Sequence, residues 1–100
     1  MAHRKASYII AYDIADPERL RRVHDCVQAR ALSLQYSVFV GRLASEELES
    51  LLDELGQRID PKQDDVRIYR LPPHARPAVL GKKLFPDGLL MPEEVFDLFE

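Results

Sequence analysis

The sequence has a single cysteine, Cys26, and no apolar stretch near the roughly 18 residues that would suggest a membrane-spanning helix. One cysteine cannot form a disulfide within the chain, which suits a reducing compartment. The polar residues 1–5 lead into no signal-peptide core. We therefore expect a cytoplasmic protein with no membrane partner, in which Cys26 is a structural, unreactive helix residue.

Several ligand-binding motifs are also missing. The sequence has no glycine-rich nucleotide-binding loop, no cysteine-rich zinc motif and no internal repeat. Its three histidines, His3, His24 and His74, are dispersed without the spacing of metal ligands. The absence of these motifs argues against a nucleotide, dinucleotide or zinc site.

The chain lacks an excess of positive charge. Its formal net charge of −3 at pH 7 argues against a generic nucleic-acid-binding protein. The charges are nevertheless segregated, because residues 1–44 contain seven Lys or Arg against four acids, whereas residues 45–65 contain eight acids against two bases. Such segregation allows one basic face on an acidic protein, although it also occurs in proteins that bind no polyanion.

The composition is that of one ordinary globular domain. The chain has 100 residues, of which 46% are hydrophobic and 31% charged. A chain of this length buries a modest core, and association with a second copy would add to it.

A run of apolar and aromatic residues at 8–14 predicts a strand buried on both faces, with Asp13 near its end. Asp16 and Pro17 then predict a helix N-cap and a first-turn proline. Because ligand and active sites favour such strand-to-helix junctions, Asp13 is a candidate functional residue. The alternative is that Asp13 only ends the strand, which is more common for an isolated aspartate.

The first helix is expected at residues 17–31, because apolar residues recur there with helical spacing. They are Leu20, Val23, Val27 and Ala31. Arginines of this helix, including Arg19 and Arg22, point away from the apolar stripe and could face a phosphate backbone near Asp13. Simple solvation of these arginines is the alternative.

Residues 34–41 alternate between two faces and predict a strand, bent or broken near Ser37 into two short strands. Leu34, Tyr36, Val38 and Val40 share one face, and Gln35, Ser37 and Phe39 share the other. Phe39 therefore lies among polar neighbours. It is either a second core contact or an exposed stacking or interface residue.

A second helix is expected at residues 45–59, capped by Ser45, with an outer face too acidic to meet nucleic acid. Asp64 and Asp65 are interpreted as solvated turn residues rather than metal ligands. An alternating strand at residues 66–71 follows and ends at Pro72. This order predicts an α+β fold over residues 1–71, a ferredoxin-like βαββαβ sandwich with two helices on one face of an antiparallel sheet.

Three segments together resemble one known family. They are Tyr12-Asp13-Ile14, the sequence Gln-Tyr-Ser-Val-Phe at 35–39 followed by Gly41, and Asp-Val-Arg-Ile-Tyr at 65–69. In this order, over residues 8–71, they resemble the small CRISPR-associated endoribonuclease family, the lesser subunit of the CRISPR spacer-acquisition complex. The chain departs from the family at Ser33, where Arg or Lys is frequent, and at Val40, where an acid is frequent.

The resemblance implies a homodimer in which Asp13 of each chain faces its twin across the interface and binds a divalent metal, Mg²⁺ or Mn²⁺. Asp13 would be both the catalytic and the metal-binding residue. The basic first-helix positions that contact nucleic acid in the family would be matched by Arg19, Arg21 or Arg22. The residues expected to support the site or the interface are Tyr12, Ser37 and Phe39.

This chemistry is physically reasonable. Two facing aspartates would raise each other's pKa unless a hard cation neutralised them, and Mg²⁺ takes oxygen ligands while keeping several waters. Two functions are open: a nuclease that cleaves RNA or DNA, and a structural bridge that holds DNA between copies of the larger CRISPR integrase subunit. A toxin-like ribonuclease outside any CRISPR locus is a third, less favoured alternative.

The remaining residues, 72–100, predict a proline-rich linker, a short strand at 78–81 and an apolar tail. The strand is suited to covering the edge of another sheet, and the resemblance implies that this sheet belongs to the partner subunit. The tail either folds back on its own subunit or contacts the integrase.

Overall fold

The computed structural model describes residues 4–74. Four strands and two helices follow one another, namely β1 (Lys5–Asp13), α1 (Pro17–Gln28), β2 (Leu32–Gln35), β3 (Val38–Ala44), α2 (Ser45–Arg58) and β4 (Asp65–Arg70). Neither helix in this part of the chain is long and apolar enough to cross a membrane. The expected strand at 78–81 and the apolar tail lie outside the described residues, as does His3.

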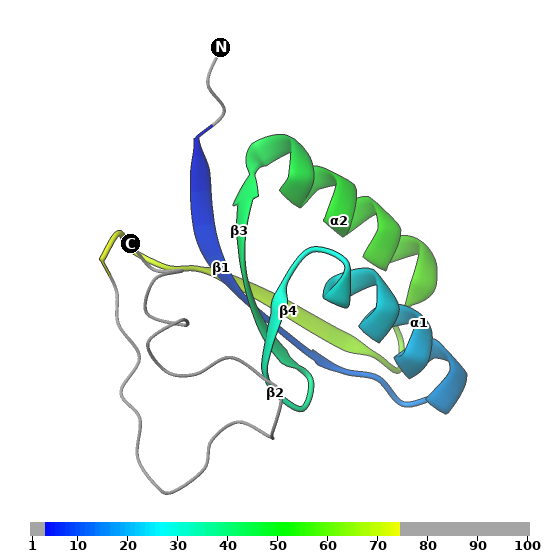
Figure 1. The fold of residues 1–100 in the computed structure, drawn as a ribbon. Helices are drawn as coiled ribbons and strands as arrows, with labels where there is room; N and C mark the ends of the chain where they lie inside the picture. Colours follow the sequence, from blue (N-terminus) through cyan, green and yellow to red (C-terminus); the bar gives the residue numbers. More distant parts are fainter. Residues whose placement is uncertain (1–3, 75–100) are drawn as a thin grey trace, which may run out of the picture.

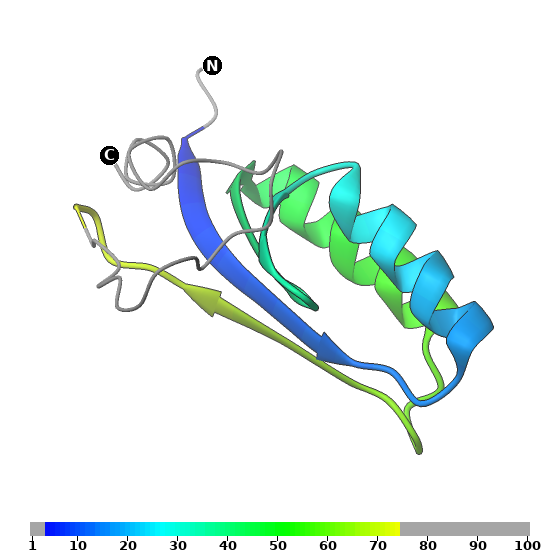
Figure 2. The same ribbon diagram turned by 60° about the horizontal axis from the view of Figure 1, so that its bottom comes forward.

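The strands form one antiparallel sheet in the order β2-β3-β1-β4. Both helices lie on the same face of this sheet, as Figures 1 and 2 show from two directions. This is the ferredoxin-like βαββαβ sandwich predicted from the order of the sequence patterns. We call the covered side the helix face and the other side the second face.

The core lies between the helices and the helix face. Strand residues Ile10 and Phe39 meet helix residues Val23, Val27 and Leu51 there, and all five are 0% exposed. Full burial of each such side chain contributes about 1.5–3 kcal/mol to the free energy of folding.

The predicted start of α1 is confirmed, but its predicted end is not. Asp16 is the N-cap, its side chain accepting a 2.9 Å hydrogen bond from the Arg19 backbone N–H, and Pro17 begins the helix as predicted. The helix ends at Gln28, three residues before the predicted end at Ala31. Ala31 nevertheless remains in the core at 7% exposure, because the chain turns there toward β2.

The predicted N-cap of α2 is wrong. The N-cap is Ala44, and Ser45 is already the first helical residue. The cause is that β3 runs into α2 without a loop, so the last strand residue takes the capping position. The backbone N–H of Ala44 donates a 2.8 Å hydrogen bond to the side chain of Glu47. A side chain from the first turn of α2 therefore binds the backbone at the helix start, in place of an N-cap side chain.

The predicted break near Ser37 is confirmed. Ser37 has a φ of 61°, which ends β2 and begins β3, and the pairing register shifts between Ser33 and Gln35. The break changes which side chains face the core. Phe39 is 0% exposed and is therefore the core contact, whereas Tyr36 is 96% exposed.

Candidate functional site

Asp13 is the last residue of β1 and is exposed. Successive side chains of a strand point to opposite faces, so Asp13 shares the second face with Ile9 and Ala11, while Ile10 and Tyr12 enter the core. The candidate carboxylate therefore lies on the face that neither helix covers, at the strand end that leads into α1.

A second carboxylate lies in register with Asp13. β1 and β4 are antiparallel, and Asp13 pairs with Asp65. Paired residues of neighbouring strands project to the same face. Asp65 is thus the first residue of β4 rather than a solvated turn residue. An antiparallel match of the first and last strands would have indicated this, because the end of one meets the start of the other.

Asp65 is partly neutralised by a neighbour on β4. Its Oδ2 atom accepts a 2.9 Å hydrogen bond from Arg67 Nε, and both side chains remain more than half exposed. Because like charges in register destabilise a sheet, Arg67 offsets the repulsion between Asp13 and Asp65. We call this exposed end of β1 and β4 the corner. It presents the carboxylates of Asp13 and Asp65 and the guanidinium of Arg67.

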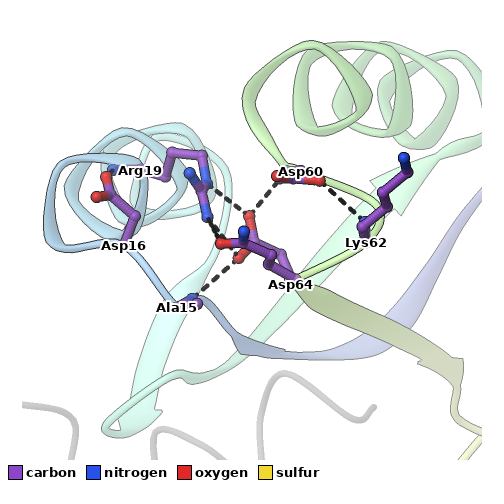
Figure 3. Close-up of polar contacts among 7 residues, drawn as sticks. Ala15, Asp16, Arg19, Asp60, Lys62 and Asp64 are labelled. Atoms are coloured by element: carbon purple, nitrogen blue, oxygen red, sulfur yellow. Dashed lines mark hydrogen bonds and ion pairs between the residues drawn. The ribbon is translucent and has the colours of Figure 1, made fainter.

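Asp64, the residue before Asp65, forms hydrogen bonds with Ala15, Arg19 and Asp60 (Figure 3). Its side chain is 0% exposed. Oδ1 accepts a 2.9 Å hydrogen bond from the Ala15 N–H, and Oδ2 accepts hydrogen bonds from the Asp60 N–H at 2.8 Å and Arg19 Nε at 2.9 Å. The expectation of a solvated turn residue is wrong for Asp64, because these donors lie far from it in sequence or depend on the folded loop.

The ion pair sets the charge state of both partners. The hydrogen bond from Arg19, assisted by the backbone N–H groups of Asp60 and Ala15, holds the pKa of Asp64 well below its usual range. The same hydrogen bond raises the pKa of Arg19. The turn after Asp13 is thereby tied to the loop between α2 and β4 through a permanently charged pair.

The three arginines expected to bind nucleic acid differ in their surroundings. Arg19 is engaged by Asp64 and also donates to the Gln63 side chain at 3.1 Å. Arg21 and Arg22 are both exposed, Arg21 beside a cavity at the β2–β3 turn and Arg22 beside Cys26 and Arg30. The role of these arginines in nucleic-acid contact stays a prediction, and Arg19 has a structural role as well.

The expected supporting residues pack together beneath the corner. The rings of Tyr12 and Phe39 stack with centroids 6.0 Å apart, and the Tyr12 hydroxyl shares a 2.9 Å hydrogen bond with Nδ1 of His24. Burial raises the pKa of Tyr12, so the phenol stays protonated. The carbonyl of Ser37 accepts a 3.1 Å hydrogen bond from the Tyr12 N–H. These contacts fix the strand end that carries Asp13.

Cys26 is a buried residue of α1 whose thiol lies 3.7 Å from the Glu54 carboxylate of α2, and it is not part of this corner. Burial, together with the nearby Glu54 carboxylate, raises the pKa of its thiol. This environment disfavours the reactive thiolate and agrees with the structural role expected for Cys26.

The corner offers a metal ion few protein ligands. Within residues 4–74, no group of three or more His, Cys, Asp or Glu side chains is arranged to hold one. The two carboxylates in register, Asp13 and Asp65, fit a hard cation that retains most of its waters, as Mg²⁺ does.

Comparisons with known proteins identify the family. The family model for CRISPR associated protein Cas2 matches residues 6–77. The CRISPR-associated endoribonuclease Cas2 1 of Nitrosomonas europaea is 42% identical over 84% of this chain and 80% of that protein. The CRISPR-associated endoribonuclease Cas2 2 of Thermodesulfovibrio yellowstonii is 41% identical over 82% of this chain and 91% of that protein.

A solved structure agrees with these matches. The crystal structure of a Cas2 protein superposes with a TM-score of 0.72, at 28% identity, over 87% of this chain and 99% of that one. The family model, which matches residues 6–77, includes both helices and the strand ends that carry Asp13 and Asp65. The chain therefore belongs to the Cas2 family of CRISPR-associated proteins.

Proposed function

We propose that the chain is a metal-dependent endoribonuclease of CRISPR spacer acquisition, with Asp13 as its catalytic and metal-binding residue. Relatives that are 42% and 41% identical are named endoribonucleases. The observation that carries the proposal is the position of Asp13, exposed at the end of β1 and in register with Asp65.

Asp13 would hold Mg²⁺ or Mn²⁺, and Asp65 is the second oxygen donor that the same chain offers. A bound cation would acidify a water molecule and stabilise the charge that develops on the scissile phosphate. The chain's own residues bind and orient the substrate. Arg67 lies beside the carboxylates, and the exposed Arg21 and Arg22 on α1 supply further positive charge for the flanking phosphates.

The proposed assembly is a homodimer formed through the second face. Near Asp13 this face carries the half-buried apolar residues Ile9, Ala11 and Val38. Pairing of two such faces would bury apolar surface and bring the two Asp13 side chains toward one another across a two-fold axis. Binding of the larger integrase subunit stays a prediction, since the tail expected to contribute to it lies outside the described residues.

The test is cleavage of labelled single-stranded and double-stranded RNA and DNA, with Mg²⁺, Mn²⁺ or EDTA. Asp13→Asn removes the charge with almost no change in volume, so we expect the fold to persist and cleavage to fall at least about 100-fold. Asp65→Asn should lower cleavage by a smaller factor and raise the Mg²⁺ concentration needed for half-maximal activity.

The control is Asp53→Asn on the exposed side of α2, purified in the same way. It should cleave as the unmodified protein does. Activity retained by Asp13→Asn would overturn the mechanism. A chain that binds nucleic acid but cleaves none of the four substrates with either metal would instead support the structural bridge between integrase subunits.

A further inference from the structure

A cavity of about 440 Å³ lies between the first half of α1 and the β2–β3 turn. The Tyr12 ring and Leu20 contribute apolar lining, and His24, Gln35 and Arg21 contribute polar groups. Its volume falls within the range of about 300–1,000 Å³ typical of small-molecule pockets. The cavity is separate from the exposed Asp13 corner and is not needed for the chemistry proposed there.

The most exposed aromatic residue of the described chain borders this cavity. Tyr36 is 96% exposed and precedes Ser37, whose φ of 61° places it in the left-handed region at the turn between β2 and β3. The ring thus loses nearly all of the burial that aromatic side chains usually gain. A solvent-exposed aromatic face beside a partly apolar cavity is the arrangement on which single-stranded nucleic acids stack their bases.

The polar groups match the rest of a nucleotide. The Gln35 side-chain amide is both donor and acceptor, so it can pair with the edge of a base. Arg21 is exposed on α1 beside the same cavity, and its guanidinium suits a phosphate. Gln35 therefore suits the edge of a base, Tyr36 suits its face, and Arg21 suits the phosphate.

The position of the cavity relates it to the candidate site. The Tyr12 N–H bonds the Ser37 carbonyl, so the turn that carries Tyr36 is fixed beside the residue that precedes Asp13. The cavity opens beside α1, whereas Asp13 lies on the second face at the same end of the sheet. One strand of nucleic acid passing around this end would meet both.

We propose that this cavity binds an unpaired nucleobase of a single-stranded nucleic acid, stacked on Tyr36 and with an adjacent phosphate at Arg21. The proposal rests on the proposed function, since it concerns a neighbouring nucleotide of the same substrate. It makes the β2–β3 turn a determinant of single-strand preference, because a paired base cannot leave its stack to enter the cavity without the cost of unpairing.

The test measures binding in EDTA, where metal-dependent cleavage is suppressed. The probe is a 12-nucleotide single-stranded RNA containing 2-aminopurine, compared with the matching DNA and with an RNA duplex. Tyr36→Ala should weaken single-strand binding by about 5- to 150-fold and abolish the fluorescence change of the probe. Duplex binding should stay within about twofold. Because Tyr36 is exposed, the substitution should not disturb the fold.

Two further variants separate stacking from charge. Tyr36→Phe keeps the ring and should retain both the affinity and the fluorescence change. Arg21→Ala should weaken binding and reduce its dependence on salt by about 0.7 in the logarithmic slope, which corresponds to one lost phosphate contact. Leu52→Ala, at an exposed position of α2, serves as the control that should bind normally.

Two outcomes would overturn the inference in different ways. If Tyr36→Ala binds single-stranded RNA and DNA as tightly as the unmodified protein, with the same fluorescence change, the cavity is not a nucleobase site and the proposed nuclease is unaffected. If the unmodified protein binds none of the three probes in EDTA, the inference fails, and cleavage with Mg²⁺ or Mn²⁺ then decides the proposed function separately. An effect on RNA and DNA alike assigns recognition to the base, and an effect on RNA alone adds a contact to the 2′-hydroxyl.

Discussion

Asp64 accepts four hydrogen bonds, two of them from Arg19 and one each from the Ala15 and Asp60 backbone N–H groups. Every group that faces its two oxygens is a donor. Substitution by Asn would place an amide NH₂ against one of these donors while removing the charge that Arg19 requires. Although Asp64→Asn changes the side-chain volume very little, it should therefore lower the stability of the folded protein substantially.

The pH dependence of stability follows from this environment. The pKa of Asp64 is lower in the folded protein than in the unfolded chain, so its contribution is complete above the unfolded value of about 3.9 and is lost as the pH falls toward the folded value. We expect the melting temperature to fall steeply below about pH 4. Asp64→Asn should remove that part of the slope and lower the melting temperature by about 5 °C or more at pH 7.

Thermal melts from pH 2.5 to pH 7, followed by circular dichroism, provide the measurement. Asp53→Asn is again the matched control, and its profile should follow that of the unmodified chain. A profile of Asp64→Asn parallel to that of the unmodified protein would show that the Arg19 ion pair does not control acid stability.

The residue scale also shows the limit of sequence reasoning. The position of Asp13 at a strand end can be predicted because a local pattern, a strand followed at once by a helix cap, surrounds it. Asp64 and Asp65 precede a strand, where acids are more often solvated turn residues, and their partners Arg19 and Asp13 lie about fifty residues earlier. Pairing across that separation depends on which strands become neighbours, and the residues near 64 carry no local mark of it.

At the scale of elements, β3 lies close to the turn between α1 and β2. A methyl group on Gly41 would lie 3.1 Å from the Ala31 Cβ and 3.2 Å from the Arg30 carbonyl oxygen. The carbonyl belongs to the backbone and cannot rotate away. Gly41→Ala should therefore lower the free energy of unfolding by about 1–3 kcal/mol, measured by urea denaturation.

Gly56 in α2 is the matched case with the opposite expectation. Nothing lies within 4 Å of a methyl group at this position, and the backbone is helical. Gly56→Ala should raise the free energy of unfolding by about 0.5–1 kcal/mol, because alanine loses less backbone entropy in a helix. If Gly41→Ala raises the free energy of unfolding as Gly56→Ala is expected to do, close packing against Ala31 is not what requires glycine at position 41.

Element types and order could be predicted because each follows from a local hydrophobic period. The residues at which the elements begin and end were harder to predict. Ser45 was given the capping role by its residue type, yet the direct passage from β3 into α2 moved the cap to Ala44. The break at Ser37 was predicted, but the alternation alone left the burial of Phe39 open and did not show that Tyr36 would be the exposed ring.

At the scale of the whole molecule, the proposed dimer makes a direct prediction. Val38→Lys places a charge on the second face beside Ala11, its partner in register, and a lysine there can reach solvent in a monomer. We expect the mass from light scattering to fall from two chains to one on dilution, with an unchanged circular dichroism spectrum.

Leu52→Lys, at a residue that is 49% exposed on α2, tests whether any added charge has this effect. It should remain a dimer at the same concentrations. A dimer that survives Val38→Lys would place the interface elsewhere and would remove the reason for two Asp13 side chains to approach one another.

The hydrogen bond from Ala15 to Asp64 joins residues 49 positions apart in the chain. Bringing such distant residues together costs loop-closure entropy, which is recovered only when the sheet pairs. During synthesis on the ribosome, Asp13 and its turn emerge long before Asp64 and β4 do. The turn after Asp13 can therefore be locked only once β4 has been made, so a nascent chain carries the candidate nuclease residue without its assembled surroundings.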